Sequence, residues 1–231
     1  MDGSAQKVTG TESSKTPLPA HELIYRRLRE QILFGEIAPG QPVTIQGLTD
    51  RLNAGMTPVR EAIRRLTSEG ALEFQGNRRV IVPLLTTENI AEIIFARQWL
   101  ESHLGLRATE RATAANLAEL TKLDDVLDAA IASGDLQGYL EYNYRFHARI
   151  YELAEAPILA AMAEGLWLRF GPSLRVVCGR LGTQNLPDRH KDLLACMRTK
   201  DAEGAARACR EDMLQGMEQV RDMLEHPTEA H

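Results

Sequence analysis

One segment, residues 44–82, constrains the fold of this chain more than any other part. Ile45, Leu48 and Leu52 recur at the spacing of one helical face, which predicts a short helix. An Asn-Ala-Gly-Met sequence follows at residues 53–56 and predicts a tight turn. The chain must therefore change direction here, before the next helical pattern starts.

A second helix and a hairpin complete this segment. Thr57 can cap the helix, Pro58 suits its first position, and Gly70 ends it. Two short strands are predicted at residues 71–74 and 79–82, on either side of a Gln-Gly-Asn-Arg turn. Two helices joined by a turn and followed by a hairpin wing form a DNA-binding unit. The segment therefore predicts a winged helix-turn-helix and double-stranded DNA as a partner.

The charge of the chain is distributed unevenly. The formal net charge is −5 at pH 7, which by itself would argue against a DNA-binding protein. Residues 20–80 nevertheless carry nine arginines against seven acidic side chains, a net charge of +2. A mildly basic head on an acidic body is expected of a protein that contacts phosphates with one end only.

The rest of the chain predicts helices. An amphipathic helix is expected over residues 20–34, and no strand pattern follows the hairpin. Six further helices are predicted, at residues 86–111, 114–133, 136–155, 157–179, 186–199 and 202–225. The expected fold is mainly α, with a winged helix-turn-helix domain at residues 20–83 followed by an all-α helical bundle at residues 84–226.

The ends of the chain and its cysteines bear on where the protein works. Residues 1–19 are polar, without the apolar core of a secretion signal, and we expect a disordered arm there and a disordered tail at 226–231. No apolar run approaches the ~18 residues that a membrane helix needs. The odd number of cysteines, without paired spacing, favours reduced thiols in a cytoplasmic protein; they are Cys178, Cys196 and Cys209.

These motifs resemble those of the GntR family of bacterial transcription regulators. In the head, the matching strings are Ile-Ala-Pro-Gly at residues 37–40 and Thr-Pro-Val-Arg-Glu-Ala at residues 57–62. The body is similar to the all-α effector domain of the FCD branch, the fatty-acid-responsive type. Phe146-His147, Asp188-Arg-His190 and the segment 205–213 carry this second match. The resemblance covers residues 20–225 and implies a homodimer, a palindromic operator and a small-molecule ligand inside the bundle.

The resemblance also implies a set of DNA contacts, which are Thr57, Arg60, Arg64, Arg65, Gly76 and Arg78. Arg60 lies near the start of the second helix, where its guanidinium can donate to O6 and N7 of guanine. The other arginines are expected mainly at phosphates. Met56 and Gly47 stand where relatives often carry arginine, so the head departs from the family pattern. The alternative for Arg60 is a surface ion pair with a neighbouring glutamate.

A metal site is the main expectation for the body. Asn143 and His147 are four residues apart and share a helix face. In the FCD branch an aspartate and a histidine at this spacing join two further histidines around a divalent metal. The corresponding positions here are Asn143, His147, His190 and Asp212, and this mixed set can still bind Zn²⁺ or Ni²⁺, although an amide oxygen is a weaker ligand. The alternative is a polar pocket without metal.

A carboxylate ligand is expected beside this site. Arg97 belongs to an Arg-x-x-Leu-Glu pattern similar to that of the same branch, and an arginine can bind a carboxylate through two hydrogen bonds. The alternative is a structural ion pair with Glu101. The expected ligand-binding residues are Arg97, Asn143, His147, Arg149 and His190.

The sequence thus favours a ligand-responsive transcription regulator, and more specifically a repressor released by a small organic acid, rather than an enzyme. Two alternatives stay open. One is an all-α metalloenzyme in which His147, His190 and Asp212 activate water. The other is a DNA-architectural protein with a degenerate pocket. A ligand that changes DNA affinity, or turnover of an acid, would distinguish the three.

Overall fold

The computed structural model describes residues 18–182 and 189–226. Residues 1–17 of the predicted arm, residues 227–231 of the predicted tail, and Asp188 lie outside these ranges. In the head the elements are α1 (Ala20–Leu33), β1 (Val43–Thr44), α2 (Ile45–Leu52), α3 (Met56–Ser68), β2 (Glu73–Gln75) and β3 (Arg79–Ile81). In the body they are α4 (Thr87–Arg111), α5 (Ala114–Ser133), α6 (Leu136–Leu153), α7 (Pro157–Leu181), α8 (His190–Thr199) and α9 (Ala202–Glu225). This mainly helical architecture is the one that the sequence predicts.

The helix-turn-helix forms because its ends are well specified. The Thr44 hydroxyl accepts a hydrogen bond from the Gly47 amide at 2.9 Å and caps α2. Asn53 ends this helix in the left-handed conformation, with φ of 47°, which asparagine adopts more readily than most residues. The apolar faces of α1, α2 and α3 then pack into one core that includes Leu28, Leu48 and Ile63.

The predicted start of α3 was wrong. The helix begins at Met56, with Gly55 in extended conformation as the N-cap residue and no side-chain cap. Thr57 and Pro58 therefore occupy the first turn rather than the cap and the first position. Amides in the first helical turn have no partner within the helix, so a proline fits there as well as at its start.

The wing is a three-stranded antiparallel sheet in the order β1-β3-β2. Val43 pairs with Val80, and Phe74 pairs with the same residue from the other side. The sequence predicted the hairpin but not β1, because two residues are too few to show an alternating pattern. The predicted strands were also each longer than the observed ones.

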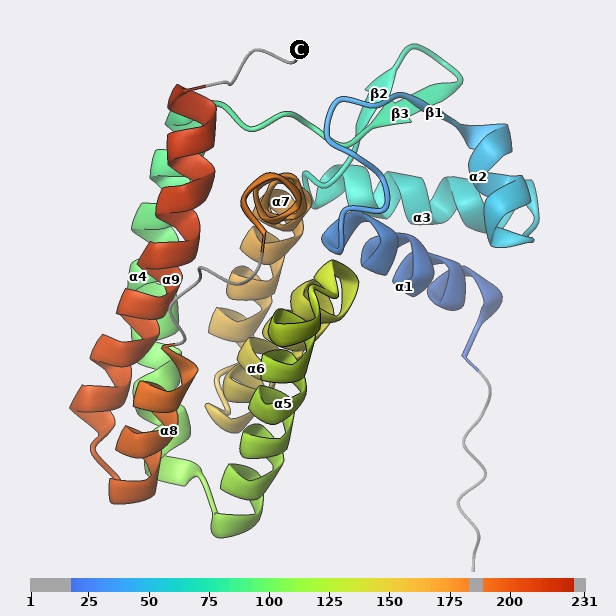
Figure 1. The fold of residues 1–231 in the computed structure, drawn as a ribbon. Helices are drawn as coiled ribbons and strands as arrows, with labels where there is room; N and C mark the ends of the chain where they lie inside the picture. Colours follow the sequence, from blue (N-terminus) through green and yellow to red (C-terminus); the bar gives the residue numbers. More distant parts are fainter. Residues whose placement is uncertain (1–17, 183–188, 227–231) are drawn as a thin grey trace, which may run out of the picture.

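In the body, α4 and α9 lie side by side along most of their lengths (Figure 1). They approach closely at Gly105, where a Cβ atom would lie only 2.4 Å from the Cys209 sulfur. Capping boxes begin α4 at Thr86 and α5 at Thr113, and each pairs with an asparagine three residues on. Within residues 18–182 and 189–226, no helix is both long and apolar enough for a membrane span.

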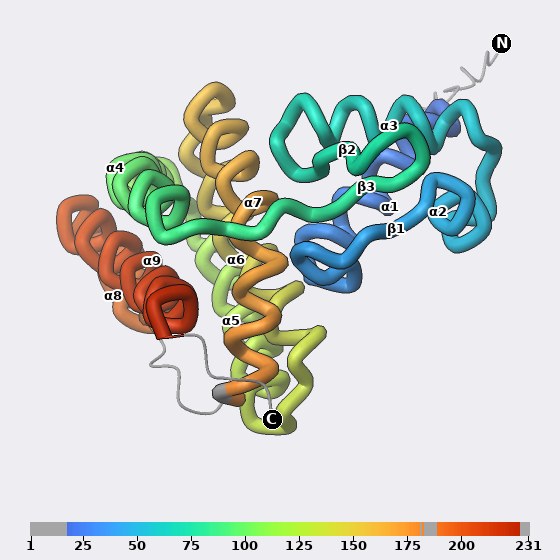
Figure 2. The backbone as a smooth tube through the Cα atoms, turned by 90° about the horizontal axis from the view of Figure 1, so that it is seen from above, coloured from blue at the N-terminus to red at the C-terminus, as the bar shows by residue number. Residues whose placement is uncertain are grey.

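Helix α7 joins the two halves of the molecule. It packs against α4 on one side and against α1 of the head on the other (Figure 2). At Gly171 the two helices meet so closely that a Cβ atom would lie 2.6 Å from the Leu33 carbonyl oxygen. Arg175 covers Gly35 and donates hydrogen bonds to Gln137 at 2.8 Å and to the Phe34 carbonyl at 3.4 Å. The head is therefore held by direct contacts as well as by the connecting chain.

Candidate functional site

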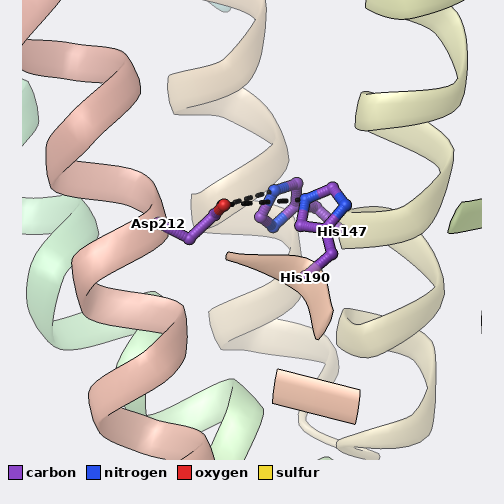
Figure 3. A group of neighbouring side chains, drawn as sticks. All are labelled: His147, His190 and Asp212. Carbon is purple, nitrogen blue, oxygen red and sulfur yellow. Dashed lines mark ion pairs between the residues drawn. The ribbon is translucent and has the colours of Figure 1, made fainter. Parts of the chain in front are cut away.

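Three helices bring two histidines and an aspartate together inside the body. His147 comes from α6, His190 is the first residue of α8, and Asp212 comes from α9 (Figure 3). The Asp212 carboxylate faces both rings, with its oxygens 3.1 Å from Nε2 of His147 and 3.7 Å from Nε2 of His190. One ligand atom from each of the three residues lies within 4.8 Å of the others, so a single ion could contact all three.

Each histidine also meets a second carboxylate through its other nitrogen. Nδ1 of His147 is 3.4 Å from Glu101 of α4, and Nδ1 of His190 is 3.2 Å from Asp124 of α5. The histidines and both of these carboxylates are buried. The sequence did not single out either acidic residue as part of the site, although Glu101 belongs to the Arg-x-x-Leu-Glu pattern. Asp124 gives no local signal, because only the packing of α5 on α8 places it there.

The carboxylates favour the protonated form of His147. Burial by itself lowers the pKa of this imidazole, but the hydrogen bonds with Asp212 and Glu101 outweigh burial and raise the pKa to about 9. For Asp212, burial raises the pKa of the carboxyl, but the His190 and His147 rings lower it by more and leave it below its usual value. Positive charge, from protons or from a metal ion, thus stabilises this cluster.

A small cavity adjoins the cluster, with a volume of about 50 Å³. Its wall includes Asn143, one helical turn before His147 on α6, as the shared helix face predicted. The other lining residues are Arg97, Tyr139, His147, Trp167, Phe170, Leu174, Asp212, Met213, Gln215 and Gly216. This volume is about that of one or two water molecules. An organic ligand would therefore have to displace part of the wall.

Arg97 lines this cavity but already has a partner. Its guanidinium forms an ion pair with Glu101 and faces the rings of Trp167 and Phe170, at 4.8 and 4.1 Å from their centroids. The structure thus shows the alternative that the sequence left open, an internal ion pair. Arg149 is not among the residues that line the cavity. It lies at the surface of α6, where it pairs with Glu119 and Glu152.

The head presents several of the predicted DNA contacts to solvent. Arg60 and Arg64 are exposed on α3, Arg78 is exposed in the turn of the wing, and neither Arg60 nor Arg64 has an ion pair with a described residue. Thr57 is exposed in the first turn of α3, and Gly76 forms the wing turn with φ of 65°.

Arg65 has a different environment from the other arginines of α3. Its guanidinium lies 3.5 Å from the centroid of the Tyr25 ring. It also forms ion pairs with Glu22 of α1 at 2.9 Å and with Glu69 at 3.2 Å. These contacts favour a role in packing α3 on α1 over a role at the DNA.

Both halves of the chain match known families. The family described as bacterial regulatory proteins, gntR family, matches residues 20–82, and the FCD domain matches residues 92–215. The transcriptional regulator McbR of Escherichia coli is 33% identical over 193 residues, which are 82% of this chain and 87% of McbR. The transcriptional repressor RspR of the same species is 24% identical over 206 residues, 89% of this chain and 90% of RspR.

The fold agrees with this assignment. The solved structure of E. coli McbR superimposes with a TM-score of 0.84 at 30% identity, over 90% of this chain and 99% of that structure. The matched families and relatives are transcription regulators rather than enzymes, so the metalloenzyme alternative is not favoured. The chain belongs to the GntR family of bacterial regulatory proteins, in the branch with an FCD domain, and is a DNA-binding, ligand-responsive transcription regulator.

Proposed function

We propose that this regulator is a repressor whose helical body binds a divalent metal and, beside it, a small organic acid that releases the protein from its operator. The observation that carries the proposal is the convergence of His147, His190 and Asp212 on one point next to a cavity. Relatives named as repressors, among them RspR, support repression rather than activation.

The donor set fits a divalent metal. Two imidazoles and one carboxylate are ligands that Zn²⁺ and Ni²⁺ accept, and the amide oxygen of Asn143 is available on the same wall. The charges around the histidines fit as well, because three carboxylates, those of Glu101, Asp124 and Asp212, lie within reach of their ring nitrogens. A dication bound by two neutral imidazoles would offset the negative charge of these carboxylates. When bound, the metal would supply a Lewis acid to which the oxygen atoms of an acid ligand can coordinate.

The wall of the cavity suggests how a ligand in the body could affect the head. Trp167 lines the cavity, and its ring meets the edge of the Tyr144 ring at 5.5 Å. Tyr144 in turn meets Phe34, at the end of α1, at 6.1 Å, and its hydroxyl accepts a hydrogen bond from Arg29 of α1 at 3.2 Å. A ligand larger than the cavity would displace this wall, and α1 would move with it. Such a ligand would change DNA affinity because it binds more tightly to the protein with α1 displaced than to the protein with α1 in its present position.

An exposed apolar surface supports a homodimer. Phe95 and Trp99 on α4 are 66% and 67% exposed, and Ile158 and Met162 on α7 are 77% and 55% exposed. Each pair is spaced four residues apart on its helix, and α4 packs against α7. Large apolar side chains left in solvent mark contact surfaces. We propose that a second copy covers this α4–α7 surface, and that the dimer presents two heads to a palindromic operator.

Metal analysis of protein without a histidine tag tests the proposal. We expect close to one divalent ion per chain in the wild type and its loss in His147→Ala, with Arg149→Ala as a control that keeps the metal. DNA fragments selected by the wild type would then be titrated with small carboxylates, and release by an acid is expected for the wild type but not for His147→Ala. A wild type without metal would contradict the metal part of the proposal, whereas unchanged DNA affinity with every acid would contradict the sensing part.

A further inference from the structure

The two histidines of the cluster have similar neighbours. In each ring Nε2 faces the shared aspartate, Asp212, at 3.1 and 3.7 Å. In each ring Nδ1 faces a carboxylate of its own. Nδ1 of His190 is hydrogen-bonded to Asp124 at 3.2 Å, and Nδ1 of His147 lies in a longer ion-pair contact, 3.4 Å from Oε2 of Glu101. The arrangement repeats although the two acidic residues come from different helices, α4 and α5.

We infer that Glu101 and Asp124 are positioning residues for the metal site, each fixing one histidine with Nε2 towards the ion; this inference rests on the metal binding proposed above. A neutral imidazole has one N–H group and one nitrogen lone pair. A carboxylate at Nδ1 accepts a hydrogen bond from the N–H there, which leaves the lone pair on Nε2. Both lone pairs then point to the same place, where Asp212 lies.

Packing alone fixes the planes of the rings but not whether nitrogen or carbon atoms face the ion and the carboxylate. Phe146 stacks on His190, with centroids 4.0 Å apart and planes 13° from parallel, and Trp167 lies 5.3 Å from His147. A ring flipped by 180° within such a slot keeps these contacts. Hydrogen bonding to a carboxylate removes this ambiguity, because the flip would put Cδ2 in the place of Nδ1 and lose the hydrogen bond.

The two carboxylates are themselves held in place. Glu101 is 1% exposed and is paired with Arg97, whose guanidinium rests on two aromatic rings. Asp124 is 3% exposed, and besides His190 it has Lys191 at 3.9 Å. Buried carboxylates destabilise a fold unless they are paired. Two of them behind two histidines of one cluster are explained if they orient the metal ligands.

The test is Zn²⁺ affinity, measured by competition with a chromophoric chelator on the full-length protein. We expect Asp124→Ala to weaken Zn²⁺ binding by about 10- to 100-fold. Asp124→Asn should recover most of this loss, because its amide oxygen still accepts a hydrogen bond from Nδ1. The matched control is Asp128→Asn on the same helix, which removes a carboxylate that also pairs with Lys191, at 2.8 Å, and should leave the affinity unchanged.

Glu101 is tested in the same assay. Glu101→Ala should weaken Zn²⁺ binding by a similar factor, and Glu101→Gln, whose amide oxygen can still accept a hydrogen bond from Nδ1 of His147, should recover most of this loss. Thermal melting of each variant shows whether it is folded. A second measurement, independent of affinity, is the NMR resonance of the Nδ1–H proton of each histidine in the Zn²⁺-loaded protein. These resonances should be protected from solvent exchange in the wild type and lost for His190 alone in Asp124→Ala.

The outcomes separate this inference from the proposed function. A wild type that binds no Zn²⁺ would overturn both. A wild type that binds Zn²⁺ while Asp124→Ala and Glu101→Ala bind it equally well would overturn only the positioning role. Equal losses in Asp124→Ala and Asp124→Asn would assign the effect to negative charge and would likewise overturn positioning.

Discussion

The arginines of α3 differ in what already surrounds them. Arg65 is stacked on Tyr25 and paired with Glu22 and Glu69, whereas Arg60 faces solvent one turn from the start of the helix. Arg65 is half exposed, but its side chain cannot turn towards DNA without giving up contacts that join α3 to α1. The recognition of bases is therefore expected from Arg60, with Arg64 and Arg78 available for phosphates.

Replacing Arg60 by alanine should weaken specific DNA binding by about 1–3 kcal/mol if the side chain recognises a base. Affinity for a scrambled duplex should change much less, because phosphate contacts are independent of sequence. Fluorescence anisotropy with both duplexes measures the two affinities. Arg65→Ala is the comparison, and it should lower the melting temperature instead. If Arg60→Ala weakens binding to both duplexes equally, Arg60 contacts a phosphate instead of a base.

The metal-free protein should lose stability as the pH rises through the weakly alkaline range. The pKa of His147 is raised from its ordinary 6.5 to about 9, mainly because the bonds with Asp212 and Glu101 outweigh burial. Protonation of this ring therefore stabilises the fold fully below pH 6.5, and the contribution, up to ~3 kcal/mol, disappears by about pH 9. Urea unfolding in the presence of a chelator at pH 6.5 and pH 9 measures the difference. In His147→Gln the same pH change should have a smaller effect, and an equal effect would point to other groups.

At the scale of residues, the sequence predicted the cluster better than its surroundings. His147 and Asn143 were predicted on one face because their spacing is helical, and the resemblance supplied His190 and Asp212. Glu101 and Asp124 could not be placed, because their contacts depend on how α4 and α5 pack against other helices. The sequence also could not decide between the two roles of Arg97, because an ion pair with Glu101 and a contact with a ligand are equally compatible with its position.

At the scale of elements, helix lengths followed the sequence closely because their ends carry strong signals. Helix α5 runs over Ala114–Ser133, where the sequence pattern placed it, between its cap residues Thr113 and Gly134. The signals failed where two candidates competed. At α3 the chain has both Gly55 and Thr57 within three residues, and the earlier one is the N-cap. Strand β1 has no independent signal, because it exists only through its pairing with β3.

Substitution of Gly171 by alanine should destabilise the protein by about 1–3 kcal/mol. The new Cβ atom would lie 2.6 Å from the Leu33 carbonyl oxygen, a backbone atom that cannot move without shifting α1. Gly165→Ala on the same helix is the control, because nothing lies within 4 Å of its Cβ position, and it should stabilise the helix by up to ~1 kcal/mol. Thermal unfolding of the two variants compares them. A Gly171→Ala variant as stable as Gly165→Ala would contradict the close contact between head and body.

At the scale of the whole molecule, the exposed apolar residues of α4 and α7 are the proposed dimer contact. Trp99→Glu should convert the proposed dimer into a monomer, because a charge buried at the centre of an apolar contact has no partner. Light scattering after size-exclusion chromatography measures the mass. Val126→Glu on α5, which alters an apolar side chain that is 42% exposed elsewhere in the body, should leave the dimer intact. If Trp99→Glu has the mass of the wild type, another surface forms the contact.

The dimer should also determine operator binding. One head has a single α3 helix to insert into a major groove, and two heads on one dimer bind two half-sites with a large gain in affinity. The monomeric Trp99→Glu protein is thus expected to keep its affinity for a single half-site while losing the preference for a palindrome. This distinguishes loss of assembly from damage to the head.

The contact between α7 and α1 sets a rule for building hybrid regulators. Gly171 leaves room for the Leu33 carbonyl, and Arg175 fills the space over Gly35. The contacts between head and body are therefore made by α1 and α7 and not by the segment that connects the two domains. Consider a hybrid protein in which the chain is joined, near Pro83, to the sensor domain of another regulator. Its peptide chain would be continuous, but the surface of the new sensor would not fit the end of α1. A transplanted sensor should therefore keep glycine and arginine at these two places on its equivalent of α7, or receive a head whose first helix ends to suit it.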